Sequence, residues 1–153
     1  MGVMYDYFRS ADDDRAKRVG GVVGVPVAAG HRGVVETKGV DAQVRIGRLH
    51  FQVLDRPWQY DDSLATQVLP EVPIGPDNWE EPTVHRLSDQ MRDSLAGVPD
   101  DRREELGRWW AGTEEFVLDR VEPAQVVALC DALLTLCRDA RDRDQHVFVW
   151  SSL

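Results

Sequence analysis

Three pairs of adjacent glutamates, at 80–81, 104–105 and 114–115, are the residues in this chain that first invite an acid–base interpretation. Two carboxylates are the usual equipment of a glycoside hydrolase, but they must face each other across a bond. Adjacent residues on a helix point about 100° apart, so none of these pairs forms such a dyad by itself. The pair at 104–105 is explained as a solvated helix face, and the pair at 114–115 as the start of a helical turn, where the helix dipole favours negative charge.

The glycine-rich stretch 19–39 lacks the glycine spacing of a nucleotide-binding motif. A phosphate-binding Walker loop has four residues between its glycines, followed by Lys and then Ser or Thr. Here Gly24 and Gly30 are separated by five residues and are followed by His31 and Arg32, and the run at 20–24 lacks the G-x-G-x-x-G spacing. We therefore interpret these glycines as turn and bulge positions between short strands.

The spacing of histidine, cysteine and serine residues in the sequence matches no metal-binding or nucleophile motif. None of the histidines lies four residues from another histidine or next to a cysteine pair, as zinc-binding motifs require. They are His31, His50, His85 and His146. The chain also lacks a G-x-S-x-G elbow. We expect no metal site, no cofactor and no catalytic residue, and the sequence favours a protein that is not an enzyme.

The charge of the chain limits the class of partner. It has 18 basic against 27 acidic residues, a net charge of −9. Nucleic acids and anionic membrane surfaces are bound by basic surfaces, so neither is an expected partner. A basic protein or a cationic ligand fits the charge better.

The compartment is predicted to be the cytoplasm. Cys130 and Cys137 lie seven residues apart on a predicted helix, about 10 Å, which is too far for a disulfide. They are expected to be apolar core residues in a reducing compartment. The N-terminal stretch turns acidic at 12–14 instead of showing a signal peptide's basic start and apolar run, and no apolar stretch approaches the ~20 residues of a membrane span.

The hydrophobic pattern predicts a single α+β domain over residues 1–153. Strands are expected at 3–8, 22–27, 34–37 and 146–150, the last apolar at successive positions and so covered on both faces. The N- and C-terminal strands are expected in one small mixed sheet packed against four to five helices. A composition of 42% hydrophobic and 29% charged residues is typical of a globular domain.

Helices are predicted from spacing and caps. A short charged helix follows residue 12, and longer ones are expected at 88–97, with Ser88 as the N-cap, and at 100–111 and 123–143. Asp41 is a candidate N-cap for a further helix ending before Pro57. For that segment a strand with alternating Leu49, Phe51 and Val53 stays open as the alternative.

The segment 57–85 differs from the rest in composition. It contains five of the eight prolines, two of the five tryptophans and six acids, and it has no Lys or Arg. Ile74 and Trp79 give it apolar side chains to pack, and its prolines reduce the entropy lost on ordering. We expect an ordered, extended acidic loop that lies over the domain.

Four motifs carry a resemblance: "MYDYFRSADDD" (4–14), "ETKGVD" (36–41), "WWAGTEEF" (109–116) and "HVFVWSSL" (146–153). Together they resemble an uncharacterised family of small bacterial cytoplasmic proteins. The long penultimate helix followed by an aromatic strand is distantly similar to YfbM-like proteins of unknown function. The resemblance implies an α+β fold and assigns no reaction. Some small acidic families of this kind have been proposed as immunity proteins that neutralise toxins.

Two functional hypotheses follow, beside a third interpretation in which the aromatic residues are core and the acids only keep the protein in solution. In the first, the acidic loop binds a basic protein, because aromatic residues anchor interfaces and charges steer association. The candidate contact residues are Trp58, Tyr60, Trp79, Glu80 and Glu81.

In the second, the protein is a small-molecule binder or an enzyme with a pocket between the sheet and the loop. Trp58, Trp109 or Trp150 would line this pocket. Its polar candidates are Lys38, Glu114 and Glu115.

Overall fold

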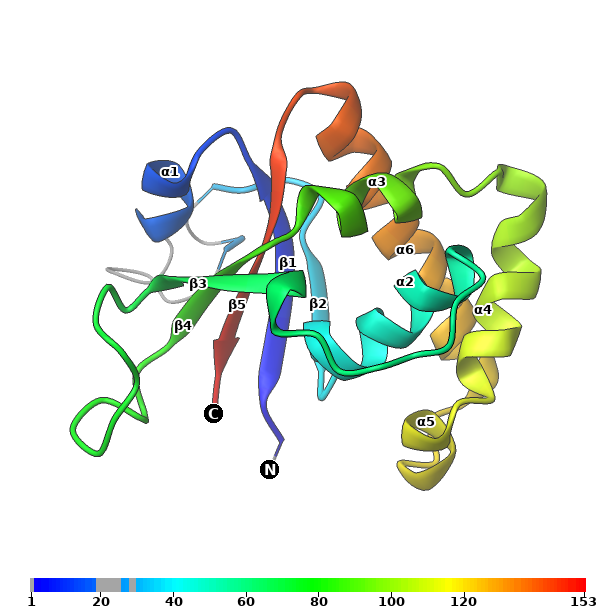
Figure 1. Ribbon diagram of the computed structural model, residues 1–153, viewed down its shortest axis with the longest axis horizontal. Coiled ribbons are helices and arrows are strands. Elements are labelled where there is room, and N and C mark those ends of the chain that lie inside the picture. The colour runs from blue at the N-terminus through cyan, green and yellow to red at the C-terminus, as the bar shows by residue number, and fades with distance from the viewer. Residues whose placement is uncertain (1, 19–25, 28–29) are drawn as a thin grey trace.

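The computed structural model describes residues 2–18, 26–27 and 30–153. Within them the chain forms one five-stranded sheet with the order β2-β1-β5-β4-β3 (Figure 1). The strands are β1 (Met4–Ser10), β2 (Val35–Lys38), β3 (Ala65–Leu69), β4 (Thr83–Leu87) and β5 (His146–Ser152). The α+β class is confirmed, and the N- and C-terminal strands pair along their whole length, from Met4 opposite Ser152 to Ser10 opposite His146.

The sheet is antiparallel at every pairing of described strands, so the prediction of a mixed sheet is wrong. Parallel neighbours need a long crossover between strands that run in the same direction. Here β3 and β4 form a hairpin, and α6 (Pro123–Asp142) brings the chain back so that β5 runs against both β1 and β4.

The central strand β5 is covered on both faces, as its apolar pattern predicts. Val147 and Val149 join the larger core beneath the helices. Phe148 and Trp150 belong to a smaller cluster on the opposite face, together with Ala16 of α1 (Asp13–Arg18). Alternate residues of a strand point to opposite faces, so one pentapeptide supplies both cores.

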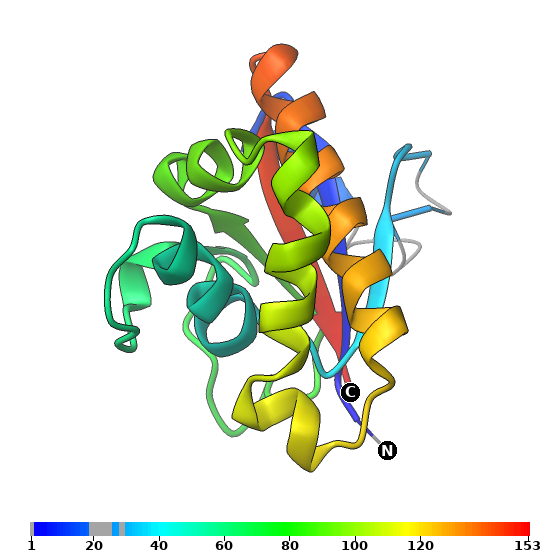
Figure 2. The same cartoon turned by 90° about the vertical axis from the view of Figure 1, so that its right-hand side faces the viewer.

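Most of the helices form a layer on one face of the sheet (Figure 2), and α1 lies on the other face. The helices of the layer are η2 (Ala42–Ile46), α2 (Gly47–Val53), α3 (Asp89–Ala96), α4 (Arg103–Ala111), α5 (Glu114–Leu118) and α6. The backbones of α4 and α6 approach closely because Gly107 faces α6. A methyl group on Gly107 would lie 2.9 Å from the Cα of Val127.

The caps predicted at Asp41 and Ser88 are confirmed. Asp41 accepts a hydrogen bond from the backbone N–H of Val44 at 2.7 Å, and Ser88 accepts one from Met91 at 3.1 Å. The segment after Asp41 is helical, with a π-helical turn (η2) leading into α2, so the alternative strand is wrong.

The prediction of one continuous loop at 57–85 is wrong, because secondary structure interrupts this segment. The short 3-10 helix η3 (Asp62–Leu64) and the strands β3 and β4 all lie inside it. Both strands bury apolar residues, Ala65 and Val68 in β3 and Val84 and Leu87 in β4. Two parts of the segment remain as loops, residues 57–61 and residues 70–82, and the second is named the acidic loop from here on.

The glycine-rich stretch gives one confirmed strand. The expected strand at 34–37 is β2. The expected strand at 22–27 falls mostly outside the described residues, and its last two, Pro26 and Val27, lie in a turn.

Candidate functional site

The acidic loop projects from the end of the β3–β4 hairpin, at the lower left in Figure 1. Asn78 organises it. Its side-chain oxygen accepts a hydrogen bond from the backbone N–H of Gly75 at 2.7 Å, and its amide nitrogen donates to the carbonyl of Pro73 at 3.3 Å. At the base of the loop, the amide of Gln67 donates to the carbonyl of Pro70 at 2.8 Å. These bonds give the loop a defined shape without a core of its own.

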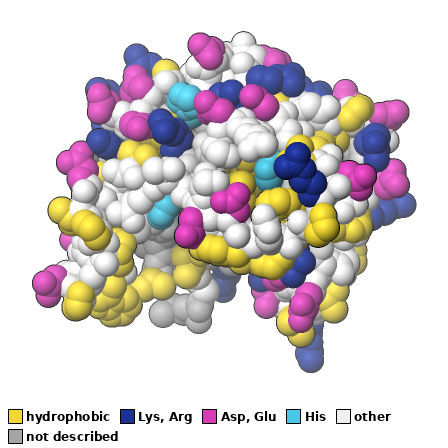
Figure 3. Space-filling model, viewed as in Figure 1, with side chains coloured by type: hydrophobic (Ala, Val, Ile, Leu, Met, Phe, Trp, Pro, Cys, Tyr) yellow, Lys and Arg dark blue, Asp and Glu magenta, His cyan; other side chains and the backbone are white. Residues whose placement is uncertain are grey.

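The loop exposes large apolar side chains. Val72, Ile74 and Trp79 are 60%, 43% and 56% exposed. Figure 3 shows hydrophobic side chains gathered at the lower left, where the loop lies in Figure 1. Soluble proteins rarely leave such side chains adjacent and uncovered unless a partner covers them.

The charges of the acidic loop are mostly uncompensated. Glu71, at its base, is paired with Lys17 at 2.9 Å, and this hydrogen bond lowers the pKa of the Glu71 carboxyl. The three remaining acids, Asp77, Glu80 and Glu81, form no ion pair with any residue that the structure describes. The exposed end of the loop therefore combines Trp79 with carboxylates alone.

Trp58 and Tyr60, the other two aromatic candidates, lie outside this loop on the segment that follows α2. Trp58 is half-buried, and the guanidinium of Arg48 sits 4.5 Å from the centroid of its ring. Arg48 also donates to Glu115 at 2.8 Å, so Arg48 joins two predicted site residues, Trp58 and Glu115. Tyr60 is 58% exposed, and a hydrogen bond to Asp62 raises its pKa.

The residues predicted to line a pocket between sheet and loop do not meet in one cavity. Lys38 is exposed on the edge strand β2, beside a groove that Phe116 also lines. Trp150 is buried on the opposite face of the sheet, and Glu114 is exposed at the start of α5. Trp109 is 39% exposed and lines a different cavity, within the helical layer.

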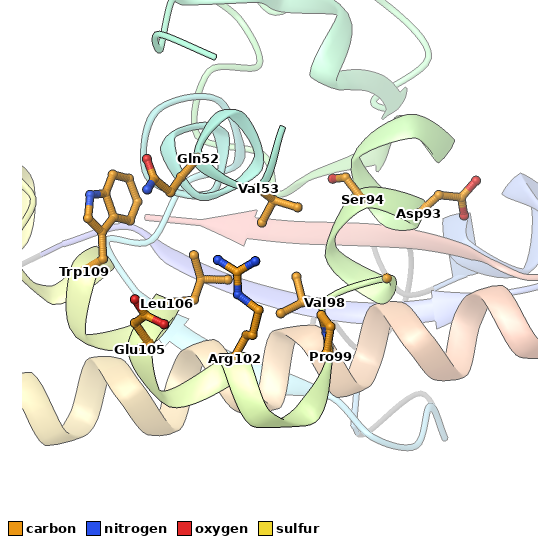
Figure 4. Close-up of a pocket in the computed structure, with 11 residues that line it drawn as sticks. Gln52, Val53, Asp93, Ser94, Val98, Pro99, Arg102, Glu105, Leu106 and Trp109 are labelled. Carbon is orange, nitrogen blue, oxygen red and sulfur yellow. The ribbon is translucent and has the colours of Figure 1, made fainter. Parts of the chain in front are cut away.

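This helical cavity has a volume of about 460 Å³ (Figure 4). The sequence alone did not predict it. It lies between α2, α3, α4 and the connection at 97–99. Arg102, Glu105, Leu106 and Trp109 point into it from one side. Their spacing of i, i+3, i+4 and i+7 is the signal in the sequence that places them on one helix face. The spacing does not predict that α2 and α3 lie opposite that face and close the cavity.

One buried acid also escaped the sequence reasoning. Asp6 in β1 is 3% exposed, and its Oδ1 atom has no hydrogen-bond partner among the described residues. Burial, with the neighbouring charge of Glu36 across the strand pair, raises the pKa of Asp6 to about 6. The indole N–H of Trp150, directly opposite Asp6, likewise finds no acceptor there.

The cysteines and histidines do not form a reactive site in the described part of the chain. Cys130 and Cys137 are buried free thiols, and burial raises the pKa of each to about 12. Among the residues described, no group of three or more His, Cys, Asp or Glu side chains is arranged to hold a metal ion. None of the described helices is both long and apolar enough to cross a membrane.

Comparison of the chain with models of protein families, with curated proteins and with solved structures gives no match. The resemblance to a bacterial family and to YfbM-like proteins therefore stays a prediction.

Proposed function

We propose that this protein is a non-catalytic binding module that meets a basic protein through its acidic loop. The observation that carries the proposal is the exposure of Val72, Ile74 and Trp79 on a loop with unpaired carboxylates and no Lys or Arg. A basic toxin neutralised by this chain, as in immunity proteins, would be one partner of this kind.

The two kinds of side chain would act at different stages of binding. The carboxylates, supported by the net charge of −9, would speed the encounter with a basic surface, and this effect weakens with salt. The apolar side chains would supply the affinity, because a large aromatic residue desolvated at the centre of an interface contributes about 2 kcal/mol or more. The hydrogen bonds of Asn78 hold the loop in shape and so reduce the entropy lost on binding.

The proposal is tested by co-purification from the cells that make the protein. The chain carrying Trp79→Ala and Glu80→Gln serves as the test bait. The matched control carries Leu118→Ala and Glu122→Gln, which also removes one exposed apolar side chain and one exposed carboxylate, but in and beside α5. In Figure 1, α5 lies on the other side of the molecule from the acidic loop.

We expect the wild-type and control baits to retain the same basic protein and the loop variant to lose it. A Trp79→Ala change alone should weaken the purified complex by about 30-fold, the equivalent of about 2 kcal/mol. Equal retention by the loop variant and the wild type would refute the role of the loop. If the retained partner is an acidic protein, the proposed role of the negative charge of the acidic loop is refuted.

A further inference from the structure

The helical cavity has walls that are fixed before any ligand arrives. Nδ1 of the buried His50 in α2 lies 2.6 Å from the hydroxyl oxygen of Ser94 in α3, which joins these two helices. The indole N–H of Trp110 donates to the carbonyl of Arg45 at 2.8 Å and so attaches α4 to the turn before α2. A rigid site avoids much of the entropy cost of binding.

The connection between α3 and α4 is held in the same way. The guanidinium of Arg138, in α6, donates to the carbonyl of Val98 and to the carboxylate of Asp100, each at 2.7 Å. The position of Val98, which contributes to the cavity floor, is therefore set by α6 beneath it.

The charged residues that face the cavity differ from their neighbours on α4. Arg103 is paired with Asp131 at 3.0 Å, and Arg108 is paired with Glu104 at 2.6 Å. By contrast, no ion pair joins the cavity-lining residues Arg102 and Glu105 to each other or to any other residue in the described ranges.

The cavity thus offers one unpaired cation, one unpaired anion and an apolar interior. Val53, Val98 and Leu106 converge at its centre in Figure 4, and the indole of Trp109 stands at one end. Figure 4 also shows Arg102, at the end of the 3-10 helix η4 (Asp100–Arg102), and Glu105, in α4, on the wall of the cavity, while Asp93 points away. Asp93 is already paired with Arg92 at 2.8 Å. The volume of about 460 Å³ lies within the range of small-molecule sites.

We propose that this cavity binds a small zwitterion with an apolar body, of the class of aromatic or branched α-amino acids. The carboxylate of the ligand pairs with the guanidinium of Arg102, which suits planar two-oxygen groups. The ammonium of the ligand pairs with Glu105. The apolar body fills the space between Val53, Val98 and Leu106, and an aromatic ring meets the indole of Trp109.

Charge balance favours the zwitterion over simpler ligands by the modest amount expected for Arg102 and Glu105, which are also exposed to solvent. A carboxylic acid without an amine would leave Glu105 unpaired beside a second negative charge. An amine without a carboxylate would leave Arg102 unpaired beside a second positive charge. This site is independent of the acidic loop, so either proposal can fail without the other.

The test is a titration with L-phenylalanine and L-leucine, followed by NMR chemical shifts of the Trp109 indole and the Gln52 side-chain amide. The comparison probes are 3-phenylpropanoate, which lacks the amine, and 2-phenylethylamine, which lacks the carboxylate. The variants are Arg102→Gln and Glu105→Gln. Their matched controls on the same helix are Arg108→Gln and Glu104→Gln, whose side chains pair with each other outside the cavity.

We expect at least one of the two amino acids to bind with a dissociation constant below about 1 mM, and each single-charge probe to bind at least about fivefold more weakly than L-phenylalanine. Arg102→Gln and Glu105→Gln should each weaken amino-acid binding by about fivefold or more, and the two controls should leave it unchanged. The proposal is overturned if neither amino acid binds, if 3-phenylpropanoate or 2-phenylethylamine binds as tightly as L-phenylalanine, or if the controls weaken binding as much as the cavity variants.

Discussion

The buried carboxyl of Asp6 should make the stability of the protein depend on pH in an unusual direction. Its pKa is raised to about 6 in the folded chain, mainly by burial and further by the charge of Glu36, against about 3.9 in an unfolded chain. The folded state therefore binds a proton more tightly than the unfolded state. Stability from this group is complete below pH 4 and is lost as the pH rises through 6.

The size of the effect follows from the two pKa values. Linkage gives a contribution of about 2.4 kcal/mol at pH 4, about 1.4 kcal/mol at pH 5 and about 0.4 kcal/mol at pH 6, relative to pH 8. Other carboxylates shift stability in the opposite direction, because hydrogen bonds with Ser63 and Arg138 lower the pKa values of Asp61 and Asp100. The Asp6 term must therefore be measured as a difference between two proteins.

The variant is Asp6→Asn, which keeps the shape and removes the titration. Urea unfolding of both proteins between pH 4 and pH 8 gives the free energy of unfolding of the wild type minus that of the variant. We expect this difference to fall by about 2 kcal/mol over that range, mostly between pH 4 and pH 6. In Glu36→Gln the fall should move to lower pH, because the second cause of the raised pKa is gone. A difference that stays constant with pH, or grows as the pH rises, would refute this reasoning.

Three further predictions concern packing, thiol reactivity and the loop. Gly107→Ala should lower the free energy of unfolding by about 1 kcal/mol, measured by thermal or urea unfolding. The reason is that crowding of the new methyl group against Val127 outweighs the gain in helix propensity. A more stable variant would show that α4 can shift away from α6. Cys130 and Cys137 should react with a thiol reagent only as fast as the protein opens, because burial raises the pKa of each to about 12; rapid labelling of the native protein would contradict this. Asn78→Ala should change the free energy of unfolding by less than about 0.5 kcal/mol. It should nevertheless speed hydrogen exchange at the backbone amide of Gly75, which donates to Asn78 in the wild type. Unchanged exchange would mean that this hydrogen bond does not order the loop.

The sequence predicted those parts of the fold that are encoded locally. Asp41 and Ser88 are side-chain caps whose geometry depends on the next few residues, and both were assigned correctly. The two-sided burial of β5 follows from successive apolar residues, a pattern typical of a strand that is covered on both faces.

The hairpin of β3 and β4 was missed for a physical reason. Each strand has only five residues, and β3 lies at the edge of the sheet with Thr66 exposed. Such a strand is specified by its pairing partner more than by its own composition. The surrounding prolines and acids then made one long loop the simpler interpretation of residues 57–85.

The candidate sites show the same division between local and tertiary information. The sequence predicts that Ile74 and Trp79 pack and hold the acidic loop in place, whereas the structure leaves them 43% and 56% exposed. The helical cavity depends on the packing of α2, α3 and α4, whose mutual positions no local pattern contains. Trp58, one of the candidate contact residues, lies beneath the guanidinium of Arg48, and no local pattern predicts that contact either.

The most direct test of the central claim uses two variants that carry a photo-crosslinking amino acid, one at position 79 in the acidic loop and one at position 118 in α5. Each variant is produced and irradiated in the cells that make the protein. Both native side chains, Trp79 and Leu118, are exposed, so either replacement leaves the core intact. We predict that irradiation joins position 79, and not position 118, to a basic protein, and that higher salt during irradiation of a lysate reduces the yield. Equal crosslinking from both positions, or none from position 79, would contradict the proposal that the acidic loop is the binding surface.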